Sequence, residues 1–86
     1  MSGVVIYTSA LCGFCSHAKR LLKQKGAEIT EIDVTFSPKK RAEMMQKTGR
    51  TSVPQIWIGD HHVGGADELL ALEEAGRLDD LLAAAA

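Results

Sequence analysis

The sequence has few cysteines and aromatic side chains, lacks long apolar runs, and shows no excess of charge of either sign. Only two of its 86 residues are cysteines, and its formal net charge is −1 at pH 7. Because the charges are nearly balanced and scattered along the chain, we expect no nucleic-acid partner. Its wholly apolar stretches extend over only a few residues, which are too short to cross a membrane. The start of the chain lacks a basic segment followed by a hydrophobic signal core, and we therefore expect a cytoplasmic location.

The length of the chain limits the architecture. A chain of this size buries about 60–65% of the surface that its unfolded form exposes, which is enough for one modest core. Hydrophobic residues make up 45% of the sequence and charged residues 24%, as in ordinary globular proteins. We therefore expect a single domain that covers residues 1–86.

Both cysteines fall in one short run, Cys12-Gly13-Phe14-Cys15. Two intervening residues allow the two side chains to meet at the first turn of a helix, and the apolar run Val4–Tyr7 before them predicts a buried strand. A disulfide between such close residues constrains the unfolded chain little, which disfavours a purely structural role. The spacing therefore indicates thiol–disulfide chemistry, in which one sulfur attacks and the other resolves.

The cysteine run begins a predicted helix that ends at Lys25-Gly26. Its apolar stripe is predicted to contain Phe14, Ala18, Leu21, Leu22 and Lys25. Cys15 shares a face with Ala18 and Leu22, whereas Cys12 lies at the helix start, beyond this stripe. We therefore expect Cys15 to be sheltered and Cys12 to be presented, where the helix N-terminus stabilises its thiolate.

An edge strand and a second helix are expected next. Residues 28–34 alternate imperfectly between apolar and polar, which suits a partly exposed strand. Ser37 is the predicted cap of a helix with Pro38 at its first position and Gly49 just past its end. Ala42 and Met45 are expected on one side of this helix, and both Met44 and Met45 are expected to pack.

A hairpin and a last helix complete the chain. Residues 55–58 and 61–63 read as two strands joined by Gly59-Asp60, with core packing expected for Trp57. The last helix is predicted to start after Gly64-Gly65 and to continue to Gly76, prolonged by leucines 78, 81 and 82. The order is strand, helix, strand, helix, strand, strand, helix.

Two-residue cysteine spacing also suits tetrahedral metal coordination, so these residues leave that alternative open. A complete zinc site needs more ligands, for which His61 and His62 are the candidates. Because neighbours on a strand point to opposite faces, at most one of them can join a given site. We interpret His17, on the solvent face of the cysteine helix, as a surface residue, with tuning of the Cys12 thiolate as the alternative.

Three separated motifs carry a resemblance to a known family. They are Ile6–Thr8 leading to the cysteine run, Thr51–Ile56 with its Val-Pro pair, and Gly64–Leu69 with its double glycine. Together they resemble the glutaredoxins, of the thioredoxin-like superfamily, over essentially the whole chain. The resemblance implies an α/β, thioredoxin-like fold with a central four-stranded mixed sheet flanked by helices. It also implies a glutathione-dependent thiol–disulfide oxidoreductase with Cys12 as nucleophile and Cys15 as resolving thiol.

The resemblance further implies a glutathione site. A cis peptide at Val53-Pro54 would present the Val53 backbone beside Cys12. The γ-glutamyl carboxylate would rest on the helix start at residues 65–67, with the ammonium group at Asp67. The glycyl carboxylate would meet Arg41 or Lys39. The implied glutathione contacts are Cys12, Phe14, Thr51, Val53, Pro54, Gly65, Ala66 and Asp67.

Four departures from the family pattern bear on the function. Gly13-Phe14 stands where many dithiol relatives carry Pro-Tyr, and resembles the Cys-Gly-Phe-Ser centre of monothiol relatives. Ser9 stands where a lysine is frequent, Ser52 replaces a threonine, and Ala66 stands where relatives have cysteine or serine.

Three functional hypotheses follow from the residues and the resemblance. In the leading one, the partners are glutathione and proteins with disulfide-bonded or glutathionylated cysteines, and the protein is a monomer without a bound metal. The alternative is a carrier or sensor of a [2Fe-2S] cluster, in which two chains share the cluster through Cys12 and two glutathione thiolates. A thioredoxin-like reductase fed by a flavoprotein is a third hypothesis.

Overall fold

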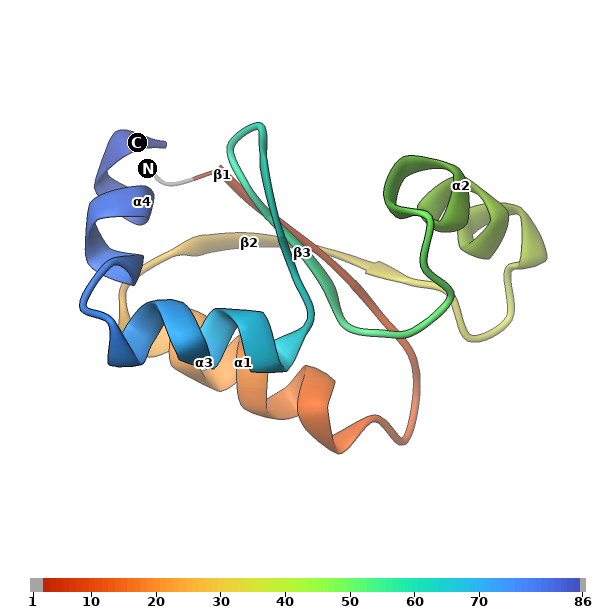
Figure 1. Cartoon of the computed structure of the whole chain (residues 1–86). Coiled ribbons are helices and arrows are strands. Elements are labelled where there is room, and N and C mark those ends of the chain that lie inside the picture. The colour runs from red at the N-terminus through yellow and green to blue at the C-terminus, as the bar shows by residue number, and fades with distance from the viewer. Residues whose placement is uncertain (1–2, 86) are drawn as a thin grey trace.

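The computed structural model describes residues 3–85 and contains one mixed sheet flanked by helices (Figure 1). The elements in chain order are β1 Gly3–Thr8, α1 Gly13–Gln24, β2 Glu28–Asp33, α2 Pro38–Thr48, β3 Gln55–Ile58, β4 His61–Gly64, α3 Ala66–Glu74 and α4 Leu78–Ala84. The predicted order of strands and helices is therefore confirmed, except that the C-terminal helical segment is divided in two.

The sheet has the strand order β2-β1-β3-β4. Strand β1 pairs with β2 in parallel and with β3 antiparallel, and β3 pairs with β4 as the predicted hairpin. The helix α1 forms the crossover between the parallel strands β1 and β2. This arrangement confirms the expected four-stranded mixed sheet, with β2 as an edge strand.

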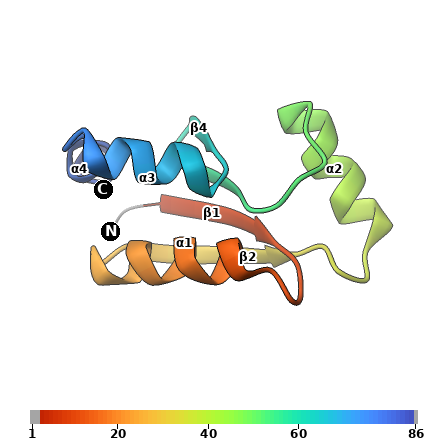
Figure 2. The ribbon, with the colours of Figure 1, turned by 60° about the horizontal axis from the view of Figure 1, so that its bottom comes forward.

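The larger part of the core lies on the face of the sheet that α1, α3 and α4 cover (Figure 2). Alternate residues of β1 point to opposite faces, so that Val4 and Ile6 enter this core while Tyr7 faces the other way. The buried members of this core are Val4, Ile6, Ala18, Leu22, Ile56, Ile58, Val63, Leu69, Leu78 and Leu82. Because residues of α1, α3 and the sheet share this core, the core holds both helices in place on the sheet.

A smaller cluster lies on the face toward α2, where Tyr7, Val34 and Met44 are buried and Trp57 packs against them. Met44 is fully buried, but Met45 is 46% exposed and Ala42 is exposed. The expected packing is therefore confirmed for Met44 and wrong for Met45, because α2 meets the sheet along the line of Met44. The helix boundaries are as predicted: Ser37 Oγ accepts a hydrogen bond from the Lys40 N–H at 3.2 Å, and Gly49 has φ 71°.

Two expectations for the other helices are also corrected. Phe14 is 68% exposed, although its spacing assigned it to the buried stripe of α1. Phe14 lies in the first turn of α1, and the buried residues of this helix are Cys15, Ala18 and Leu22. The C-terminal segment bends at Gly76, whose φ of 71° ends α3, so that Leu78 and Leu82 reach the core from a separate helix.

No helix within residues 3–85 has both the length and the apolar character needed to span a bilayer.

Candidate active site

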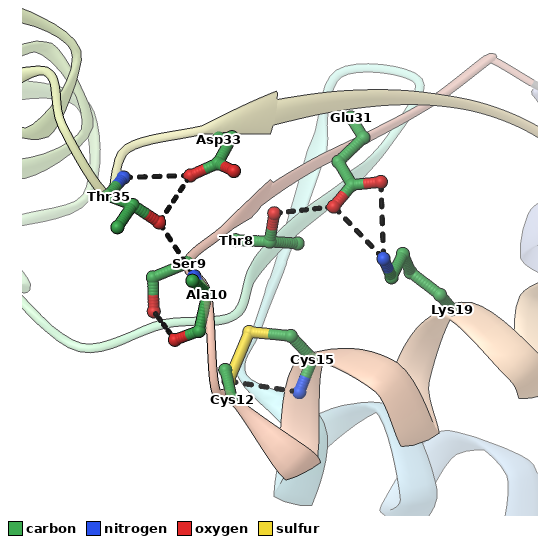
Figure 3. A network of polar contacts seen from close by, with 9 residues as sticks. All are labelled: Thr8, Ser9, Ala10, Cys12, Cys15, Lys19, Glu31, Asp33 and Thr35. Carbon is green, nitrogen blue, oxygen red and sulfur yellow. Dashed lines mark hydrogen bonds and ion pairs between the residues drawn. A yellow bond between two sulfur atoms is a disulfide. The ribbon is translucent and has the colours of Figure 1, made fainter.

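Cys12 and Cys15 form a disulfide at the start of α1 (Figure 3). Cys12 is the N-cap residue, and its Sγ accepts a hydrogen bond from the Cys15 N–H at 3.1 Å. Cys15 is 2% exposed, whereas Cys12 is only partly buried. The structure thus confirms that one sulfur is sheltered and the other is presented, with a backbone donor directed at the presented sulfur.

The loop that precedes Cys12 is tied to the segment after β2 (Figure 3). The Ala10 N–H donates a hydrogen bond to Thr35 Oγ1 at 2.6 Å, and the Thr35 N–H donates to Asp33 Oδ1 at 2.8 Å. Leu11 adopts φ 57° and is fully exposed beside Cys12. The edge strand therefore helps to hold the loop that carries the nucleophile.

A second loop approaches Cys12 from the other side. Its Val53-Pro54 peptide bond is cis, as the resemblance implied, and the Val53 carbonyl oxygen lies 3.9 Å from Cys12 Sγ. Fully buried Gln55 anchors this loop, since its amide nitrogen donates to the Ser52 carbonyl oxygen at 3.0 Å. The Gln55 amide oxygen in turn lies 2.9 Å from His62 Nε2. The backbone of Val53 is thus held beside the reactive sulfur from within the protein.

A groove of about 310 Å³ runs from the start of α1 to the start of α3. Its lining residues are Phe14, Arg50, Ser52, Val53, Pro54, Gly65, Ala66, Asp67 and Glu68. Six residues predicted to contact glutathione thus lie together, at positions 14, 53, 54 and 65–67. Cys12 lines a neighbouring hollow.

The remaining predicted ligand contacts lie outside the groove lining. Thr51 is absent from it, and its carbonyl oxygen accepts a hydrogen bond from Arg41 Nη1 at 3.3 Å. Neither Arg41 nor Lys39 lines the groove. Sequence reasoning therefore did not identify the cation of this groove, which is Arg50.

The start of α3 lacks a side-chain cap because Gly65 is its N-cap residue. Glu68, three residues later, forms an ion pair with Arg50 at 2.7 Å between Oε1 and Nη1. The Arg50 guanidinium lowers the pKa of the Glu68 carboxyl, the backbone N–H groups of Glu68 and Gly65 lower it further, and partial burial opposes them. A glutamate three residues after an N-cap is half of a capping box, a sequence signal that could have pointed to Glu68. No local pattern pointed to Arg50.

The neighbouring hollow, of about 460 Å³, is lined by both cysteines. At its far side the Thr8 hydroxyl donates to Glu31 Oε2 at 2.6 Å, and Lys19 Nζ lies 3.0 Å from the same oxygen (Figure 3). The Thr8 hydroxyl and the Lys19 ammonium lower the pKa of the Glu31 carboxyl, against the effect of burial. Lys19 is therefore a cation on the hollow that also contains Ser9, where relatives frequently carry lysine.

The histidines lie apart from the cysteines. His17 is exposed on α1, and no metal-binding cluster of three or more His, Cys, Asp or Glu side chains occurs within residues 3–85. His62 stacks on Trp57 with ring centroids 4.7 Å apart, and burial together with the charge of Arg50 lowers its pKa. The zinc alternative thus finds no set of ligands in the described part of the chain.

The sequence of this chain matches a known family of proteins. The family model described as Glutaredoxin matches residues 4–63. The chain belongs to the glutaredoxin family. It is 56% identical to a glutaredoxin of Pseudomonas aeruginosa over 98% of this chain and 100% of that protein. It is 46% identical to glutaredoxin 3 of Escherichia coli K12, over 95% of this chain and 99% of that one.

Solved structures agree with this assignment. The buckwheat glutaredoxin in complex with glutathione has a TM-score of 0.88 and 30% identity, over 98% of this chain and 79% of that chain. The glutaredoxin of Brucella melitensis has a TM-score of 0.83 and 54% identity, over 95% and 89% of the two chains. The fold of this glutaredoxin is therefore thioredoxin-like, and the protein is a thiol–disulfide oxidoreductase with a redox-active cysteine pair.

Proposed function

We propose that this glutaredoxin uses glutathione as its co-substrate to reduce glutathione mixed disulfides and protein disulfides through Cys12, with Cys15 as the resolving thiol. The observation that carries the proposal is the half-buried Cys12 sulfur, which lies between the Cys15 N–H and the Val53 carbonyl, next to the groove that ends at α3. The buckwheat relative solved with glutathione supports the same ligand.

The Cys12 thiolate begins the glutathione route by attacking the glutathionyl sulfur of a mixed disulfide. The client leaves as a thiolate that takes up a proton, and Cys12 is left bonded to glutathione. The thiolate of a second glutathione then attacks that glutathionyl sulfur, so that glutathione disulfide forms and Cys12 is restored. Each cycle therefore consumes one reduced glutathione, and the glutathionyl group taken from the client becomes the other half of the glutathione disulfide.

Cys15 acts in the second route, in which Cys12 attacks a protein disulfide. The client is then bonded to Cys12, and the Cys15 thiolate attacks Cys12 to release it. This step leaves the Cys12–Cys15 disulfide that the structure contains, which two glutathiones reduce in turn. Since Cys15 is 2% exposed, it is within reach of Cys12 but not of an outside disulfide.

Glutathione in the groove would pair its cysteinyl backbone with Val53, as an added strand pairs with a sheet edge. Its γ-glutamyl carboxylate would lie on the N–H groups at the start of α3, with the ammonium group at Asp67. Phe14 and Pro54 would contact its apolar atoms. Thr51 stays a predicted contact.

Two cysteine variants test the proposal, with the glutathione-coupled reduction of a glutathionylated peptide as the assay. Cys12→Ser is expected to abolish turnover, because the attacking sulfur is lost. Cys15→Ser is expected to retain the glutathione route and to lose most protein-disulfide reduction. Turnover by Cys12→Ser would refute the assignment, and reduction by a flavoprotein reductase in place of glutathione would favour the thioredoxin-like hypothesis.

The first turn of α1 favours a second activity, the binding of a [2Fe-2S] cluster between two chains. A Cβ at Gly13 would have no neighbour within 4 Å, and Phe14 is 68% exposed, so the turn that follows Cys12 is not packed against other parts of the protein. Cys12 and a glutathione thiolate from each of two chains would hold the cluster, whose iron such thiolates bind. Anaerobic reconstitution with iron, sulfide and glutathione should give a coloured dimer, and a colourless monomer would refute this activity.

We also propose that the protein acts in the cytoplasm and that it is a monomer when no cluster is bound. The redox chemistry supports this location, because glutathione keeps thiols reduced there. Cell fractionation with an antibody and sizing of the reduced protein test the two statements.

A further inference from the structure

We propose that Arg50, held over the start of α3 by Glu68, binds the γ-glutamyl carboxylate of glutathione and sets the affinity for glutathionylated substrates. The inference rests on the proposed function and adds to it a cation contributed by the loop between α2 and β3. Arg50 is the residue that touches the ligand, and Glu68 is a positioning residue that acts through it.

Among the residues that the structure describes, Arg50 is the one lysine or arginine whose side chain lines the groove. The two other cations considered for a glutathione carboxylate do not line it. Arg41 instead donates to the Thr51 carbonyl oxygen, which ties α2 to the loop. Arg50 is therefore the cationic side chain that the groove offers to a carboxylate.

Backbone donors converge on the same end of the groove. The first N–H groups of a helix have no partner within the helix, and Gly65 provides no side-chain cap for α3. The N–H groups of Ala66 and Asp67 are among these donors, because both residues lie in the first turn of α3. A carboxylate there would receive these two hydrogen bonds and lie beside Arg50, which is 46% exposed.

The ion pair with Glu68 orients Arg50 without using up its donors. The contact joins one guanidinium nitrogen, Nη1, to Glu68 Oε1 at 2.7 Å. A guanidinium has five N–H donors in a planar fork, so others can bind a second carboxylate. Gly64 makes room for the pair, because a Cβ there would lie 2.7 Å from Glu68 Oε1 and 3.0 Å from Arg50 Nη1.

The test measures the KM and kcat of the protein for a glutathionylated peptide, from the release of the peptide thiol at fixed glutathione. Arg50→Gln is expected to raise KM about five- to tenfold with little change in kcat, because a charge-assisted hydrogen bond is lost from a partly exposed site. Glu68→Gln should raise KM about two- to threefold. The double variant should match Arg50→Gln, since Glu68 acts through Arg50.

The matched control is Arg77→Gln, the same substitution at an exposed arginine just beyond the C-terminal end of α3. This control should leave KM unchanged. A peptide carrying glutathione esterified at its glycyl carboxylate identifies the carboxylate that Arg50 binds. The effect of Arg50→Gln should persist with this ester. Thermal melts of each variant exclude unfolding as the cause.

Three results would overturn the proposal: an unchanged KM in Arg50→Gln, an effect that disappears with the ester, or additive effects in the double variant. The last would show that Glu68 binds glutathione itself or acts through stability. These results leave the proposed function intact, because that function fails only if the unmodified protein shows no Cys12-dependent turnover.

Discussion

Replacing Gly64 by alanine should damage both the stability of the protein and its groove. Gly64 ends β4 with φ 112°, in a region that side chains rarely adopt, and the new Cβ would lie 2.7 Å from Glu68 Oε1. The backbone conformation alone costs about 1–3 kcal/mol, from which the lower entropy of the unfolded alanine chain removes about 0.4–1 kcal/mol. The steric contact adds less than about 1 kcal/mol, because the atoms it displaces are the ends of two flexible, half-exposed side chains and only their ion pair is disturbed.

Gly26→Ala is the matched control, because Gly26 also has a positive φ, 78°, but a Cβ there meets nothing within 4 Å. We expect a loss of about 1 kcal/mol for Gly26→Ala and about 2 kcal/mol for Gly64→Ala. For a domain of this size, the difference of about 1 kcal/mol corresponds to about 4–8 °C in Tm. Urea unfolding of the reduced proteins, followed by circular dichroism, measures both losses.

The kinetic effect separates the two glycines further. Gly64→Ala should raise the KM for a glutathionylated peptide, because Arg50 must move, whereas Gly26→Ala should leave KM unchanged. The reasoning is refuted if the two variants lose equal stability and share one KM.

Two further predictions concern stability. Met44→Ala should cost about 2–4 kcal/mol and Met45→Ala less than about 0.5 kcal/mol in urea unfolding, because only Met44 is buried. The lowered pKa of Glu31 means that its bonds with Thr8 and Lys19 stabilise the fold above its ordinary pKa, and that this contribution is lost as pH falls through the lowered value. Between pH 7 and 3, Glu31→Gln should therefore lose less stability than the unmodified protein. Because the Glu31 side chain is 40% exposed, the two losses of stability should differ by less than about 1 kcal/mol. An equal loss in both proteins would contradict the prediction.

Local patterns predicted most of the elements of this fold. The apolar run Val4–Tyr7, the boundary residues around α2 and the turn at Gly59-Asp60 each specify an element through nearby residues alone. The exposed Phe14 shows the limit of periodicity, because spacing assigns a residue to a stripe but cannot show where the neighbouring elements stop covering it.

The same limit explains the errors in the second and last helices. Met44 and Met45 are both apolar neighbours, and only the crossing of α2 over the sheet decides which of them is buried. Gly76 was recognised as a helix end, but the leucines beyond it carry a helical pattern that does not reveal the bend between the two helices.

The site was predictable as far as its motifs extended. The cysteine run, the Val53-Pro54 pair and the double glycine each gave residues that the structure brings to one place. Arg50 was missed because it belongs to no motif, and its contact with Glu68 joins segments that only the tertiary fold brings together.

The strand register explains why three distant segments meet at one site. In neighbouring strands Ile6 pairs with Ile56, and Ile56 pairs with Gly64. Because β3 runs antiparallel to both β1 and β4, the end of β1, the start of β3 and the end of β4 lie at the same end of the sheet. A slip of β3 by one residue would move the Val53 segment by about 3.3 Å, which is comparable with its 3.9 Å separation from Cys12 Sγ. The register of the buried strands, rather than the loops themselves, therefore sets the geometry of the site.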